Sequence, residues 1–64
     1  MTMSRSEQTK KAILDAAERL FVNKGHEGSS MREITQLANV NLAAVNYHFG
    51  SKDELIIAVM KRRL

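Results

Sequence analysis

The feature that most constrains this chain of 64 residues is a short connection, Asn39-Val40-Asn41, between two short amphipathic segments. Apolar residues recur at helical spacing on both sides, which predicts one helix over residues 31–38 and another over residues 42–48. A turn this short forces two helices to cross steeply. Asn39 tolerates the left-handed backbone that ends a helix, and Asn41 is a good N-cap for the helix that follows.

Longer helices are predicted on both sides of this pair. The first spans about residues 6–24, because five apolar residues fall on one face: Ile13, Ala16, Ala17, Leu20 and Phe21. Gly25 is the expected stop, since glycine readily adopts the backbone that closes a helix. The last helix is predicted over residues 52–64. In the first helix, on the face opposite to its apolar residues, Asp15 and Arg19 have the favourable acid-first spacing of an ion pair.

Serine and glutamate mark the starts of three of these helices. A serine three residues before a glutamate can form a capping box, in which each side chain bonds to the backbone amide of the other residue. The pairs with this spacing are Ser4 with Glu7, Ser30 with Glu33, and Ser51 with Glu54. The capping signature therefore repeats at the starts of the second and fourth helices.

The predicted core joins these helices into one small all-α fold. The second helix contributes a stripe of apolar residues, Met31, Ile34, Leu37 and Ala38. Val40 is placed beneath the turn, and Val45 and Phe49 are spaced to join it. The chain contains neither proline nor cysteine, so disulfides and thiolate zinc sites cannot stabilise it. The expected fold is a small helical bundle that contains a helix-turn-helix.

Charge and hydropathy restrict the environment more than the function. No apolar run approaches the roughly 18 residues needed to span a bilayer. The first residues, MTMSRSEQTKK, lack the apolar segment of a secretory signal. A cytoplasmic protein without a membrane partner is therefore expected. The net charge of +3 and the pI of about 9.7 are compatible with a polyanionic partner but do not require one.

The residue pattern does not indicate catalysis. His26 and His48 are the only histidines, and neither lies in a metal-binding or nucleophile motif. Asp53 and Glu54 are adjacent carboxylates, but compensation of a helix dipole accounts for both. There is no glycine-rich phosphate loop. We therefore expect no enzymatic activity, no cofactor and no metal.

The last predicted helix is apolar around roughly two-thirds of its circumference. Its apolar residues are Leu55, Ile56, Ile57, Ala58, Val59, Met60 and Leu64. One side must pack on the other helices, and the opposite side is expected to meet a partner. A helical protein-interaction module that uses this face is therefore one functional hypothesis. A compact bundle with no special role is another.

Two segments resemble a known family. The runs ILDAAERLFVNKGHEGSS and MREITQLANVNLAAVNYHFGSKDEL are similar to the N-terminal DNA-binding domain of the TetR (tetracycline repressor) family of bacterial transcription regulators. The resemblance covers nearly the whole chain and implies a homeodomain-like three-helix core followed by the start of a connecting fourth helix. The chain departs from the family at Asn39, where glycine is usual, at Ala43, where glycine is common, and at Asn46, where tyrosine is common.

The resemblance implies that the helix over residues 42–48 reads DNA in the major groove. It places six residues at DNA-facing positions: Leu42, Ala43, Ala44, Asn46, Tyr47 and His48. Because this helix contains no Lys, Arg, Asp or Glu, reading is expected from neutral groups. Ala43 and Ala44 can contact thymine methyl groups, and Asn46 can bond to adenine. The alternatives are helix filler for the alanines and a solvated surface residue for Asn46.

Phosphate contacts are expected around this helix. Tyr47 and His48 are candidates, as is Lys52, which lies at a helix start where backbone amides attract anions. Lys52 can equally be a tolerated surface lysine. Arg32 is a candidate for a phosphate or a guanine, or it is a solvated arginine. Three basic residues of the first helix are further candidates for the flanking backbone: Arg5, Lys10 and Lys11.

The resemblance also implies partners outside these residues. TetR-like proteins continue into a larger helical domain that binds ligands and forms dimers, so that domain is expected to be missing from this chain. A homodimer formed through it would place two reading helices on a near-palindromic site in double-stranded DNA. A small-molecule effector bound in the same missing domain would change the spacing of the two readers and relieve repression.

Overall fold

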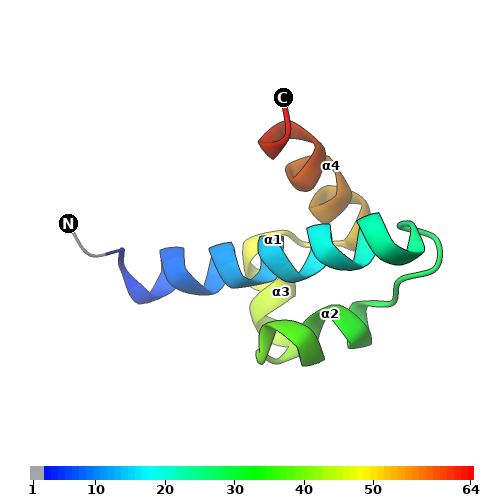
Figure 1. Cartoon of the computed structure of the whole chain (residues 1–64). Coiled ribbons are helices and arrows are strands. Elements are labelled where there is room, and N and C mark those ends of the chain that lie inside the picture. Colours follow the sequence, from blue (N-terminus) through cyan, green and yellow to red (C-terminus); the bar gives the residue numbers. More distant parts are fainter. Residues whose placement is uncertain (1–2) are drawn as a thin grey trace.

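Four helices make up the described part of the chain (Figure 1). They are α1 (Arg5–Lys24), α2 (Met31–Ala38), α3 (Leu42–His48) and α4 (Lys52–Arg62). The computed structural model describes residues 3–64, so Met1 and Thr2 of the amino-terminal segment lie outside it. No strand occurs within residues 3–64. The predicted all-α class is confirmed, and the bounds predicted for the second and third helices match those of α2 and α3.

The two outer helices differ slightly from the prediction. α1 begins at Arg5, one residue earlier than expected, because Ser4 and Glu7 form a complete capping box. α4 ends at Arg62 and does not continue to residue 64. The amides of Arg63 and Leu64 donate to carbonyl groups three residues back, at 3.1 and 3.3 Å. This tighter pattern is typical of a final helical turn.

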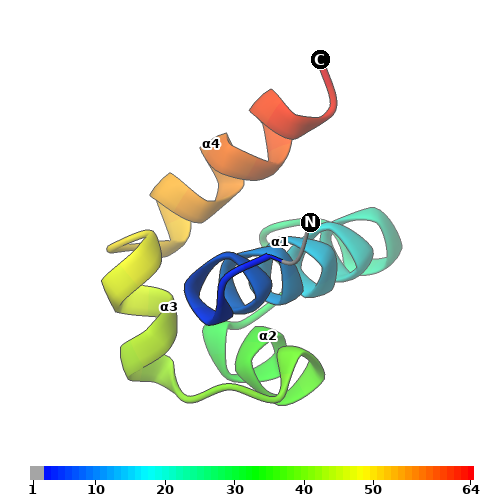
Figure 2. The same ribbon diagram turned by 90° about the vertical axis from the view of Figure 1, so that its left-hand side faces the viewer.

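Helix α1 is the central element of the fold, since it contacts each of the other three helices. Viewed close to its axis, α1 lies between α4 on one side and the α2–α3 pair on the other (Figure 2). Gly25 ends α1 with a positive φ of 77°, as its position predicted, and its amide donates to the carbonyl of Phe21 at 2.8 Å. None of the helices in the described part is long and apolar enough to cross a membrane.

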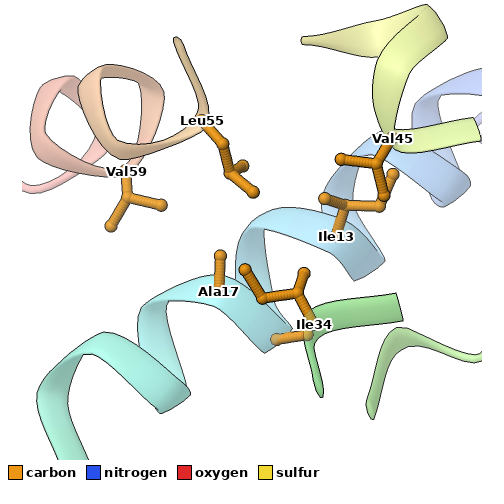
Figure 3. Close-up of a cluster of buried hydrophobic side chains, with 7 residues drawn as sticks. Ile13, Ala17, Ile34, Val45, Leu55 and Val59 are labelled. Carbon is orange, nitrogen blue, oxygen red and sulfur yellow. The ribbon is translucent and has the colours of Figure 1, made fainter. Parts of the chain in front are cut away.

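The core is a single cluster to which every helix contributes a fully buried side chain. Ile13 of α1, Ile34 of α2, Val45 of α3 and Leu55 of α4 have no exposed surface. These side chains point toward one another in Figure 3, together with Ala17. Partly buried apolar side chains surround this cluster: Leu14, Leu20, Phe21, Met31, Ala38, Val40 and Phe49. Val40 and Phe49 are the ones predicted beneath the turn.

Two details of the predicted faces are wrong. Leu37 was expected in the buried stripe of α2, but 45% of its surface is exposed. The reason is that Leu37 lies about 60° from Ile34 on the side away from Met31 and Ala38, which pack against the core. Asp15 does not pair with Arg19. Its carboxylate accepts instead from Lys11, four residues earlier in α1, and from Arg62 in α4.

The left-handed backbone at Asn39 gives the first testable prediction. Its φ of 58° and ψ of 46° lie in a region that side chains with a Cβ normally avoid. We expect Asn39→Ala to lower the free energy of unfolding by about 1 kcal/mol, because alanine lacks the local tolerance of asparagine. Asn39→Gly should stay close to the parent chain. Urea denaturation measures both values, and an alanine variant as stable as the glycine variant would contradict the argument.

Candidate nucleic-acid interface

The turn between α2 and α3 is fixed by its own backbone. The amide of Asn39 donates to the carbonyl of Gln36 at 3.2 Å, and that of Val40 donates to the carbonyl of Thr35 at 3.0 Å. The Oδ1 atom of Asn41 accepts from the amide of Ala44 at 2.9 Å and caps α3, as predicted. These bonds satisfy carbonyl groups at the end of α2 and an amide at the start of α3.

Helix α3 has one buried residue and a broad exposed face. Val45 is fully buried, whereas 83% of Tyr47 and 51% of Leu42 are exposed. At about 100° per residue, positions 43 and 47 fall opposite Val45, and positions 42 and 46 lie on one flank, about 60° and 100° from Val45. Ala43 and Asn46 are indeed exposed. Four of the six residues predicted to face DNA therefore share one solvent-facing surface.

The other two predicted residues of α3 flank this surface. Ala44 and His48 are half-buried. The ring of His48 lies edge-on to that of Tyr47, with 5.1 Å between ring centroids, and 6.3 Å from that of Phe49, which packs against the core. These contacts restrict His48 to the edge of the exposed face. No ionisable carboxylate, ammonium or guanidinium group lies on α3, so its outer face offers methyl groups, an amide, a phenol and an imidazole.

The start of α2 combines a cap with an ion pair. The amide of Glu33 donates to Ser30 Oγ at 3.1 Å, and the amide of Ser30 donates to Glu33 Oε1 at 3.0 Å, which completes the predicted capping box. The other carboxylate oxygen of Glu33 accepts from the ammonium of Lys24 at the end of α1. The hydrogen bond from Lys24, together with the bond from the Ser30 amide, lowers the pKa of the Glu33 carboxyl.

Arg32 lies in this first turn and is exposed. No carboxylate within residues 3–64 forms an ion pair with it. Its guanidinium is therefore free to bind an anion next to the helix start. The position agrees with the predicted role, although Arg32 and the exposed face of α3 come from different helices.

The start of α4 forms only half of the predicted capping box. Ser51 Oγ accepts from the amide of Glu54 at 3.2 Å, but the Glu54 side chain does not return a bond to the amide of Ser51. The backbone of Ser51 is more extended than that of Ser30, with φ of −153° compared with −101°.

Lys52 occupies a place that the sequence did not indicate. Its side chain is half-buried, and its ammonium donates to the backbone carbonyl of Ser29, just before α2. The buried hydroxyl of Ser29 in turn donates to the carbonyl of Gly25 at 2.9 Å. Lys52 therefore connects the start of α4 to the loop that positions α2. Nothing local could reveal this bond, because the two residues are 23 positions apart.

These features define a class of protein. Two short helices joined by a fixed turn, with the second helix anchored by one core residue and exposed along its outer face, form a helix-turn-helix of the kind that reads DNA. The family model described as bacterial regulatory proteins, tetR family, matches residues 13–59. The chain therefore belongs to the tetR family, and it carries the helix-turn-helix of a transcriptional regulator.

Individual relatives agree with this assignment. The transcriptional regulator TtgR of Pseudomonas putida is 34% identical over 59 residues, which cover 92% of this chain and 28% of TtgR. The transcriptional repressor Rv3405c of Mycobacterium tuberculosis is 43% identical over 54 residues, covering 84% of this chain and 29% of the repressor. The chain thus spans less than a third of the length of these relatives.

A solved structure shows the same fold. A crystal structure of a HlyIIR mutant protein superposes with a TM-score of 0.88 and 41% sequence identity, covering 92% of this chain and 33% of the HlyIIR chain. Sequence and structure therefore match the same part of longer proteins. Within residues 3–64, no three side chains of the types that bind metals come close enough together to hold an ion.

The lowered pKa of Glu33 gives a prediction about acid stability. An ionised Glu33 stabilises the fold above the ordinary carboxyl pKa of 4.5, and this contribution is lost as pH falls through the lower pKa of the folded state. We expect Glu33→Gln to be less stable than the parent chain at pH 7 and to approach its stability near pH 3. Urea denaturation across this pH range measures the difference.

The control for this prediction is Glu27→Gln, which alters an exposed loop glutamate that forms no ion pair in the described residues. It should change stability little at any pH. A Glu33→Gln deficit that is independent of pH would show that the carboxylate charge is not what stabilises the start of α2.

Proposed function

We propose that this chain binds double-stranded DNA as a sequence-specific regulator, with α3 in the major groove. One observation supports the proposal most: Val45 is fully buried while Tyr47, on the other side of α3, is 83% exposed. A helix held in this way offers a rigid outer face for base edges, which is the geometry of reading helices in helix-turn-helix proteins.

The neutral face of α3 determines the kind of reading we propose. Ala43 presents a methyl group suited to the methyl of thymine, and Asn46 presents an amide that can bond bidentately to adenine. Leu42 adds apolar surface at the start of the helix. Ala44 is half-buried, so only part of its methyl group is available for a contact with a base. An arginine–guanine contact, common in other readers, is not available from α3 itself.

Phosphate contacts would then come from the rim of this face. Tyr47 and His48 lie at the end of α3, and Arg32 lies in the first turn of α2. Lys52 brings its charge to the start of α4 while its ammonium bonds to the Ser29 carbonyl. Such contacts supply most of the affinity for DNA and fix the orientation of the reading helix, but they carry no sequence information.

We also propose the wider partners that the family suggests. The relatives are more than three times as long as the matched segment, which leaves room for a domain that binds an effector and forms a homodimer. Two α3 helices would then occupy successive major grooves of a near-palindromic operator. The activity would be repression in the cytoplasm, relieved by a small-molecule effector and without catalysis.

A second candidate function uses α4. Ile57 and Met60 are 43% and 62% exposed on its outer side, whereas Leu55 and Val59 are buried on its inner side. An exposed apolar face on a terminal helix supports a protein-interaction module. The two functions are compatible if a partner covers α4 while α3 binds DNA. A chain that bound a protein partner but selected no DNA sequence would favour the second alone.

The reading role of Asn46 is tested by Asn46→Ala. We expect this variant, when used to select duplexes from a random pool, to accept any base at one position where the parent chain prefers adenine, since each bidentate contact contributes about 1–3 kcal/mol of discrimination. Asn23→Ala removes an equally exposed asparagine from α1 and should leave the preference unchanged. Identical selections from the parent chain and both variants would reject the proposed reading face.

The role of Lys52 is tested by the salt dependence of binding. If Lys52 contacts a phosphate, Lys52→Ala should weaken binding to all duplexes and flatten the slope of log K against log salt by about one unit. If Lys52 only holds the Ser29 carbonyl, the variant should be less stable and bind more weakly with an unchanged slope. Fluorescence anisotropy over a range of salt concentrations, with thermal melting in parallel, distinguishes these outcomes.

A further inference from the structure

A groove lies where α1, α3 and α4 meet, at the carboxyl end of the reading helix. It has a volume of about 170 Å³. It is lined by residues of the three helices and by Phe49, which directly follows α3. The lining includes Lys10, His48, Phe49, Glu54, Ile57 and Lys61. Its floor is aromatic and aliphatic, and its rim is charged. The contacts proposed for α3 use neither Glu54 nor Lys61, and the sequence offered Lys10 only as one of three candidates for the flanking DNA backbone.

The ammonium of Lys10 lies near an aromatic ring at this groove. Its Nζ atom lies 6.0 Å from the centroid of Phe49, at the outer limit of a cation–π contact. Lys10 forms no ion pair within residues 3–64, in contrast to the neighbouring Lys11, which pairs with Asp15. A cation from α1 therefore lies at the end of α3, near the ring of Phe49, which packs against the core.

The other charges on the rim are also without ion-pair partners. Lys61 and Glu54 are exposed, and neither takes part in an ion pair in the described part of the chain. Two ammonium groups and one carboxylate thus line the groove, and His48 adds a ring nitrogen that can donate a hydrogen bond. The groove is net positive and offers several donors, which suits an anion.

The groove is continuous with the exposed face of α3. His48 lines it, and the His48 ring contacts that of Tyr47, whose side chain belongs to the reading face. An anion bound here would therefore lie directly beside the DNA segment that α3 contacts. The backbone of that duplex is the polyanion that this position can reach without a second partner.

We infer that this groove binds a backbone phosphate of the duplex just outside the bases read by α3, with Lys10 as its principal ligand and His48 as a second donor. Lys61 adds positive potential from α4, and Glu54 opposes the phosphate and limits affinity. The inference rests on the proposed function, because it requires α3 to bind DNA. It assigns a DNA contact to α1 and an inhibitory charge to α4.

The first experiment replaces single phosphates by uncharged methylphosphonates. The probe is a duplex that the parent chain has selected from a random pool, with one replacement at a time along both flanks. We expect one flanking replacement to weaken binding of the parent chain severalfold and to leave binding of Lys10→Gln unchanged, because that contact is already lost. Lys10→Arg should behave as the parent chain. The inference is overturned if every flanking replacement weakens the parent and Lys10→Gln equally.

The second experiment predicts a gain of affinity. Glu54→Gln should tighten binding to all duplexes by roughly two- to fivefold, the scale of one charge interaction at short range in water. Asp53→Asn is the matched control, since it removes the same charge from the first turn of α4. Asp53 directly precedes Glu54 but lies outside this groove. Equal gains from both variants would show a general effect of net charge and would count against a local phosphate.

These outcomes separate the inference from the proposal on which it rests. If the parent chain selects no sequence, and Asn46→Ala changes nothing, the proposed reading face is wrong. If selection succeeds and depends on Asn46, but Lys10→Gln keeps the full salt slope and the full methylphosphonate pattern, only the phosphate site is wrong. Thermal melting of each variant identifies any loss of binding that comes from unfolding. We expect no such loss for Lys10→Gln, because the exposed side chain of Lys10 contributes little to the core.

Discussion

The arrangement of this domain depends on the mutual burial of one aliphatic side chain from each helix. Ile13, Ile34, Val45 and Leu55 have no exposed surface, and few other side chains are buried completely. A domain of this size hides only about 60% of the surface of its unfolded chain, so each of these contacts is a large part of the stability. Val45 is also the sole fully buried residue of α3. The orientation of the reading face therefore depends on the same cluster that stabilises the fold.

Polar contacts add to this small core where the helices begin and end. The turn at Asn39 sets α2 against α3 through backbone bonds. The Lys24–Glu33 pair connects α1 to the start of α2, and Lys52 connects α4 to the loop before α2. These contacts surround the reading helix without placing a charge on it. Under the proposed function, neutral groups of α3 would read bases, while charged groups on neighbouring helices, together with Tyr47 and His48 at the end of α3, would contact phosphates.

The parts of the structure that the sequence predicted are those decided within one or two helical turns. The Ser30 capping box, the left-handed Asn39 and the Asn41 cap all depend on near neighbours, and each is present. Contacts between distant residues were missed. These are the bond of Lys52 to Ser29 and the ion pair of Asp15 with Arg62 of α4, since no local spacing rule identifies either partner. For the candidate site, the DNA-facing positions of α3 came from the family resemblance, and two of the six, Ala44 and His48, are half-buried, whereas helical spacing predicted the burial of Val45. Helical spacing could not show that Lys10 lies near Phe49, because that contact joins α1 to the end of α3.

Two kinds of interaction, of very different strength, hold helix α4 against the rest of the domain. Leu55 and Val59 anchor it in the core. Its last turn is held to α1 by ion pairs of Arg62 and Arg63 with Asp15 and Glu18, all at partly exposed side chains. Exposed ion pairs contribute only about 0–1 kcal/mol each, and the apolar surface of Met60 on the outer side remains open to a partner. A partner that covered this surface could therefore shift the far end of α4 at low energetic cost. Because Glu54 and Lys61 of the same helix line the groove beside α3, such a shift would change the potential felt by a DNA phosphate without altering the reading face.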